Sequence, residues 1–72
     1  MKTKEKYELE KLVNSFACEM KKRLIQKMEA GYLGWRTMPP EFLQSGLKEN
    51  SISEDWIDVA NFAAFLWYQN QT

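Results

Sequence analysis

The sequence contains no histidine and only one cysteine, Cys18. It can therefore form no disulfide within the chain, no Cys/His metal site and no histidine-dependent catalytic triad or dyad. Ten basic and ten acidic residues cancel, so the basic excess of a general nucleic-acid binder is missing and we expect no DNA or RNA partner. No apolar run approaches the roughly 20 residues of a membrane span, and no apolar stretch follows the charged residues 1–6 as in a secretory signal. We expect a cytoplasmic protein that does not bind membranes.

The chain has 72 residues, of which 44% are hydrophobic and 14% aromatic. This composition is typical of a folded protein, but a chain of this length buries only about 60% of its unfolded surface. We expect one all-α domain over residues 1–72, with residues 1–6 as a loose tail. The remaining stability would come from well-packed helices or from self-association, and we favour a homo-oligomer.

Residues 4 to 30 are expected to form one long helix, because neither glycine nor proline interrupts them before Gly31. Apolar residues recur at steps of three and four and so form one stripe: Leu9, Leu12, Val13, Phe16, Met20, Leu24 and Met28. Such a helix would be roughly 40 Å long, which is more than a small monomer can cover. Its stripe is therefore predicted to contact another copy of the protein.

A loop rich in glycine and proline follows, and Pro39-Pro40 then favours a short second helix over residues 40–49. Ser53 and Asp55 are competing N-cap candidates for a third helix over residues 54–70. That helix is apolar nearly all round, which is typical of a helix buried at the centre of an assembly. The predicted fold is thus a long N-terminal helix, a loop, a short helix and a buried apolar C-terminal helix.

The polar residues of this third helix are Asp55, Asp58 and Asn61, which lie three residues apart on one face. Two carboxylates at this spacing can share a Mg²⁺ ion. Equally, they can be a cap and a first-turn carboxylate that the helix dipole favours. Asn61 stands among apolar neighbours, so we expect its amide to be buried with partners for its donors and acceptors.

Trp35 and Arg36 in the loop could present an indole and a guanidinium to a flat anionic ligand. Alternatively, Trp35 only fills the junction between the first and third helices. The basic segment that contains Lys22 and Lys27 is either a solvated helix face or a place for phosphate.

Three short runs resemble the small phage and bacterial MazG-like nucleotide pyrophosphohydrolases, in particular the dATP/dGTP pyrophosphohydrolase-like group. They are Gly34-Trp35, Pro40-Glu41-Phe42-Leu43 and Asp58-Val59-Ala60-Asn61-Phe62-Ala63. The segment 16–24 is similar to the opening helix of that group, so the resemblance covers residues 16–68. It implies an all-α oligomer with a nucleoside-triphosphate pocket that uses Mg²⁺.

The resemblance also implies two metal-binding motifs, Glu-Glu-x-x-Glu on one helix and Glu-x-x-Asp on the next. Asp55-Trp-Ile-Asp58 matches the second motif with aspartate in place of its glutamate, whereas only Glu49 remains of the first. A metal cluster that neutralises a triphosphate depends on its carboxylates. We therefore expect a shortened relative that binds a nucleotide without hydrolysing it and needs no cofactor.

The predicted function is sequestration of a nucleotide or of a cyclic-nucleotide defence signal by a phage-type protein. The predicted ligand-binding residues come from the first helix, the loop and the third helix: Trp35, Arg36, Asp58, Asn61, Phe65, Lys22 and Lys27. One alternative is a Mg²⁺-dependent pyrophosphohydrolase with Asp55, Asp58 and Glu49 as metal ligands. A second alternative is a helical protein–protein interaction module.

Overall fold

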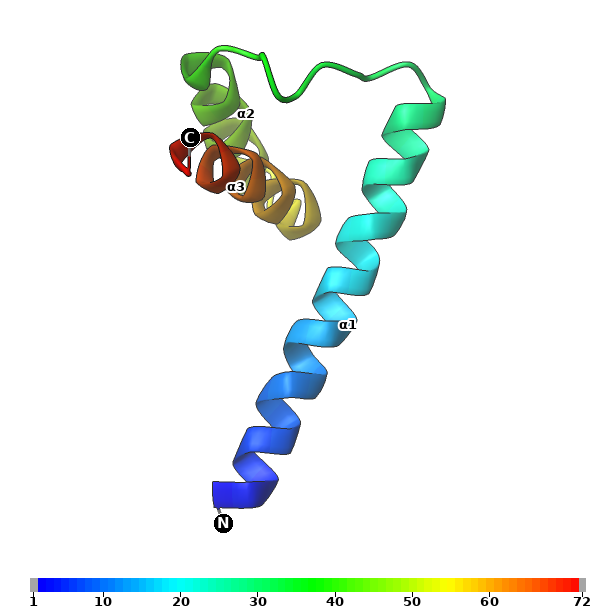
Figure 1. Cartoon of the computed structure of the whole chain (residues 1–72), viewed down its shortest axis with the longest axis vertical. Helices are drawn as coiled ribbons and strands as arrows, with labels where there is room; N and C mark the ends of the chain where they lie inside the picture. The colour runs from blue at the N-terminus through cyan, green and yellow to red at the C-terminus, as the bar shows by residue number, and fades with distance from the viewer. Residues whose placement is uncertain (1, 72) are drawn as a thin grey trace.

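The computed structural model describes residues 2–71 and contains three α-helices, α1 (Lys2–Glu29), α2 (Pro40–Ile52) and α3 (Trp56–Asn70). The predicted all-α fold with a long N-terminal helix is confirmed (Figure 1). α2 is three residues longer than the sequence predicted, and α3 begins two residues later. Within the described part of the chain, no helix combines the length and the apolar character that crossing a membrane requires.

α1 begins at Lys2, so residues 2–6, which we expected to be a loose tail, are helical. Lysine and glutamate are good helix formers and residues 2–6 contain neither glycine nor proline, which accounts for the difference; Met1 lies outside the described residues. The helix ends at Glu29, and Gly31, where we expected the helix to be interrupted, follows it with a φ of +98°. The Gly31 N–H donates to the carbonyl of Met28 at 3.0 Å and the Tyr32 N–H donates to that of Lys27 at 2.9 Å. This pair of bonds is the Schellman motif, which requires the left-handed conformation that glycine adopts without strain.

Asp55 is the N-cap of α3, because its side chain accepts a hydrogen bond from the Asp58 N–H at 3.2 Å. Ser53, the competing candidate, instead donates its hydroxyl to the carbonyl of Asn50 at 3.1 Å. Between them Glu54 adopts a φ of +60°. The left-handed residue reverses the chain, so that α3 folds back along α2.

α2 and α3 pack closely side by side (Figure 1). Leu43 of α2 is fully buried, and no other apolar side chain among residues 2–71 is buried. A Cβ atom on Gly46 would lie only 2.6 Å from Cζ of Phe62 in α3. The missing side chain at residue 46 therefore allows the aromatic ring of α3 to rest on the backbone of α2.

α1 contacts α3 but not α2, and it carries no buried residue over its whole length. Its N-terminal part extends away from the other two helices (Figure 1), and residues 2–16 are all exposed. The molecule is correspondingly elongated, with extents of 44 × 26 × 26 Å.

The expected burial of α3 is not found in this single chain. Only Asp58 and Asn61 of α3 are buried, whereas Trp56 and Trp67 are 54% and 65% exposed. Two neighbouring helices cover only part of a cylinder, so the polar face of α3 lies inward and most of its apolar circumference stays partly exposed.

Candidate functional site

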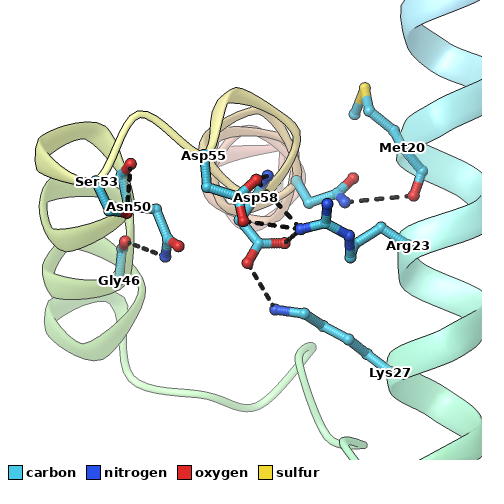
Figure 2. A network of polar contacts seen from close by, with 9 residues as sticks. Met20, Arg23, Lys27, Gly46, Asn50, Ser53, Asp55 and Asp58 are labelled. Atoms are coloured by element: carbon cyan, nitrogen blue, oxygen red, sulfur yellow. Dashed lines mark hydrogen bonds and ion pairs between the residues drawn. The ribbon is translucent and has the colours of Figure 1, made fainter.

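A cluster of four charged side chains joins α1 to the N-terminus of α3 (Figure 2). Nη1 of Arg23 lies 2.9 Å from Oδ2 of Asp55 and 3.1 Å from Oδ1 of Asp58. Nζ of Lys27 lies 3.0 Å from Oδ2 of Asp58. Arg23 and Lys27 are one turn apart on α1, and Asp55 and Asp58 are one turn apart on α3. The cluster therefore balances two cations against two carboxylates.

This arrangement makes the carboxyl group of Asp55 more acidic than that of an ordinary aspartate. The hydrogen bond from Arg23 lowers the pKa of its carboxyl group, and the hydrogen bond from the Asp58 backbone N–H lowers it further. Both interactions favour the ionised carboxylate, so α1 is attached to the start of α3 through a charge that persists well below neutral pH.

Asn61 is 2% exposed, which confirms the predicted burial of its amide. Its Nδ2 donates to the carbonyl of Met20 at 3.3 Å. A carbonyl can only accept, so the orientation of the amide follows from this bond. Oδ1 of Asn61 is buried and has no hydrogen-bond partner among residues 2–71. An unpaired buried acceptor costs about 1–3 kcal/mol, and a ligand donor that reached it would recover part of that cost.

Aromatic side chains from the loop and α3 form a compact group. The Trp35 ring stacks on Phe65 with centroids 5.0 Å apart and planes at 17°, and it meets Tyr68 edge-on at 5.0 Å. The guanidinium of Arg36 lies 5.2 Å from the Trp35 ring. Trp35 thus packs against α3, and its indole forms part of a larger aromatic surface.

Gln69 anchors the loop to the end of α3. Its Nε2 donates to the carbonyl of Met38 at 2.9 Å and to that of Trp35 at 3.4 Å. The loop backbone is thereby held against α3, so Trp35 is positioned by hydrogen bonds as well as by ring stacking.

A pocket of about 630 Å³ lies between the C-terminal part of α1, the loop and α3. Its lining is mainly apolar and aromatic, with three polar side chains, Lys27, Asp58 and Asn61. The apolar lining includes Leu24 and Met28 of α1, Leu33, Trp35 and Met38 of the loop, and Phe62 and Phe65 of α3. Mostly apolar walls with a few converging polar groups are typical of small-molecule sites.

The predicted ligand-binding residues divide into two groups. The structure brings Trp35, Phe65, Lys27, Asp58 and Asn61 together in the wall of this one pocket. Arg36 packs against the Trp35 ring and does not line the pocket. Lys22 is exposed and pairs with Glu19 at 3.1 Å on a face of α1 that points away.

The three predicted metal ligands are not gathered. Glu49 is exposed on α2, and residues 2–71 contain no group of three acidic, histidine or cysteine side chains that could hold a metal ion. Each carboxylate oxygen of Asp55 and Asp58 instead accepts a hydrogen bond from Arg23 or Lys27. A cation at the pair would have to displace both basic side chains.

Lys22 and Lys27 are the predicted ligand residues of the basic segment of α1, whereas Arg23 is the residue that joins Lys27 in reaching α3. The helical period identifies Arg23 as the residue that faces α3, because positions 20, 23, 24 and 27 share one face of α1 and position 22 does not. Gln69 was missed as well, and nothing in its sequence neighbourhood marks it as a loop anchor.

No family model, no curated protein and no solved structure matches this chain.

Proposed function

We propose that the protein binds a nucleotide in the pocket between α1, the loop and α3, without hydrolysing it. The observation that carries the proposal is the convergence of an aromatic lining, a buried amide with an unpaired oxygen and a lysine in one pocket. A volume of about 630 Å³ lies within the usual range for small-molecule sites, about 300–1,000 Å³.

The base would lie against the aromatic wall that Trp35 and Phe65 form. Stacking on aromatic side chains contributes about 1–3 kcal/mol per base in nucleic-acid complexes. One Nδ2 hydrogen of Asn61 is committed to Met20, so the unpaired Oδ1 is the atom that we expect to recognise the base, and it requires a ring N–H or an exocyclic amine as donor.

The phosphate would lie toward Lys27 and Arg36. Lys27 has three N–H donors and uses one on Asp58, so its ammonium can also donate to a phosphate oxygen. The charges of Arg23 and Lys27 are balanced by the two aspartates. This balance favours a ligand of low total charge, such as a cyclic nucleotide with one charge per phosphate or a nucleoside monophosphate, over a triphosphate.

Binding without turnover is supported by the same ion pairs, since they occupy the carboxylates that a magnesium site would use. A phage-type protein of this kind would sequester a nucleotide or a cyclic-nucleotide defence signal. We further propose that it acts as a homo-oligomer, in which other copies cover the exposed apolar surface of α1 and α3.

The test is isothermal titration calorimetry with a panel of mononucleotides, triphosphates and cyclic mono- and dinucleotides, with and without Mg²⁺. At least one cyclic or monophosphate nucleotide should bind, and Lys27→Gln and Arg36→Gln should each weaken it about tenfold, or 1.4 kcal/mol. Lys22→Gln is the matched control and should bind as the parent does, because Lys22 and its partner Glu19 both lie outside the pocket, whereas Arg36 lies over the Trp35 ring that lines it. Arg36 lies outside the ion-pair cluster, so its variant separates loss of the ligand from loss of the fold.

If no nucleotide in the panel binds the parent, the proposed function is wrong. If the protein instead releases pyrophosphate from triphosphates with Mg²⁺ over many turnovers, and Asp58→Asn abolishes this, the pyrophosphohydrolase alternative replaces it.

A further inference from the structure

α3 carries an apolar face on the side away from the pocket. Trp56, Ala60, Ala63 and Trp67 are spaced four, three and four residues apart and so share one side of the helix. Both tryptophans are more than half exposed, and Ala63 is exposed between them. We call these four residues the outer face of α3. Because the two alanines are small and lie between the two tryptophans, another helix can pack across this face.

α1 carries a second uncovered apolar surface, made of Leu9, Leu12, Val13 and Phe16. These side chains are 57%, 63%, 63% and 37% exposed, and they continue the stripe that contacts α3 further along α1. We call them the N-terminal stripe. α1 is one continuous helix that already lies against the opposite side of α3, so within one chain the stripe cannot reach the outer face of α3 (Figure 1).

We propose that two copies of the chain exchange these surfaces, so that the N-terminal stripe of each lies across the outer face of α3 of the other. This inference rests on the self-association that is part of the proposed function and names its interface. Small residues such as Ala60 and Ala63 permit close approach of a crossing helix, and Leu12 and Val13 supply the side chains that fill the space between the tryptophans.

The area favours exchange over pairing of α1 with α1. Four stripe side chains and two tryptophans together expose several hundred Å² per protomer, on the order of the roughly 800 Å² that a specific interface buries on each side. Pairing of the stripes alone would bury a smaller area and leave both tryptophans in water. A reciprocal exchange is a closed two-fold interface, which consumes both surfaces and leaves no edge for further growth.

The experiment uses two variants that place a charge on an exposed position of each surface, Leu12→Glu and Ala63→Lys. Size-exclusion chromatography with light scattering should show a dimeric parent and at least tenfold weaker association for each variant alone. An equimolar mixture should form a heterodimer, because it keeps one intact contact and sets the introduced glutamate against the introduced lysine in the other. Lys11→Glu and Gln44→Lys, which put the same charges on exposed positions off these surfaces, should associate as the parent does.

Three results would overturn the inference. A parent that is monomeric at micromolar concentration removes self-association altogether. An Ala63→Lys variant that still dimerises places α3 outside the interface. Two monomeric variants that do not combine show that each surface pairs with itself. Nucleotide binding by the variants, measured by calorimetry, is a separate readout, because neither Leu12 nor Ala63 lines the pocket.

Discussion

The two helices that pack on α3 do so by different physics. α2 is close-packed against it, with Leu43 fully buried and the Phe62 ring resting on Gly46. α1 buries no residue, and its polar contacts with α3 are the pairs of Arg23 and Lys27 with Asp55 and Asp58 and the hydrogen bond from Asn61 to Met20. Apolar packing resists salt and acid, whereas ion pairs weaken under both. We therefore expect α2 and α3 to be the stable unit and α1 to be the helix whose attachment responds to conditions.

The largest effect is expected from Leu43→Ala, which removes the centre of the α2–α3 contact. Truncating a fully buried leucine destabilises a protein by about 2–5 kcal/mol, and we expect about 3 kcal/mol here. Urea unfolding followed by circular dichroism measures this change. Phe42→Ala on the same helix is the control, because Phe42 is 60% exposed and should cost much less. Equal losses for the two variants would show that α2 is not held by its buried leucine.

The next effect is expected from Arg23→Gln, which leaves the buried carboxylate of Asp58 with Lys27 alone. Removing one partner of a fully buried ion pair costs about 3–5 kcal/mol, but Arg23 is one-third exposed, so we expect about 2 kcal/mol. The loss should diminish in high salt, in contrast to that of Leu43→Ala. Lys22→Gln, at the neighbouring exposed pair, should leave the unfolding curve unchanged. A salt-independent loss at Arg23 would contradict the electrostatic attachment of α1.

Gly46→Ala tests how closely α2 approaches α3. Alanine favours the helix by about 1 kcal/mol, but its Cβ would meet the Phe62 ring, and overpacking of this kind costs about 1–3 kcal/mol. We expect a net loss of about 1 kcal/mol in urea unfolding, whereas Ser45→Ala at the exposed neighbouring position should be neutral or slightly stabilising. The double variant Gly46→Ala/Phe62→Leu should recover part of this loss, because leucine has no ring for the new Cβ atom to meet. A stabilising Gly46→Ala would mean that the ring moves aside freely.

The smallest effect is the pH dependence from Asp55. Its pKa is lowered in the folded protein by Arg23 and by the Asp58 N–H, so the folded state holds this proton less tightly than the unfolded state. The stabilisation is fully present above the ordinary aspartate pKa of about 3.9 and is lost as the pH falls through the lower folded value. Thermal unfolding between pH 6 and pH 3 should show this decline, and Asp55→Asn should flatten it. An Asp55→Asn curve parallel to that of the parent would assign the acid sensitivity to other carboxylates.

Local rules were enough to predict much of this protein. Helical periodicity and the positions of Gly31, Pro40 and Asp55 predicted three helices and most of their ends, because capping and φ preferences depend on a few neighbouring residues. The run from Trp56 to Tyr68 also pointed to Asn61 as a buried amide. Helical spacing also placed Asp58, Asn61 and Phe65 on one side of α3, but it did not bring Lys27 and Trp35 to them.

Only the tertiary structure decided which partner each side chain meets. Whether Arg23 or Lys22 reaches α3 depends on how α1 is rotated about its axis, and the pairing of Asp55 and Asp58 with cations depends on that rotation too. The sequence predicted that the stripe of α1 and the circumference of α3 are apolar. It also predicted that one small chain could not cover them, but which side chains stay exposed depends on how many helices meet in space and how they are rotated, and not on their pattern.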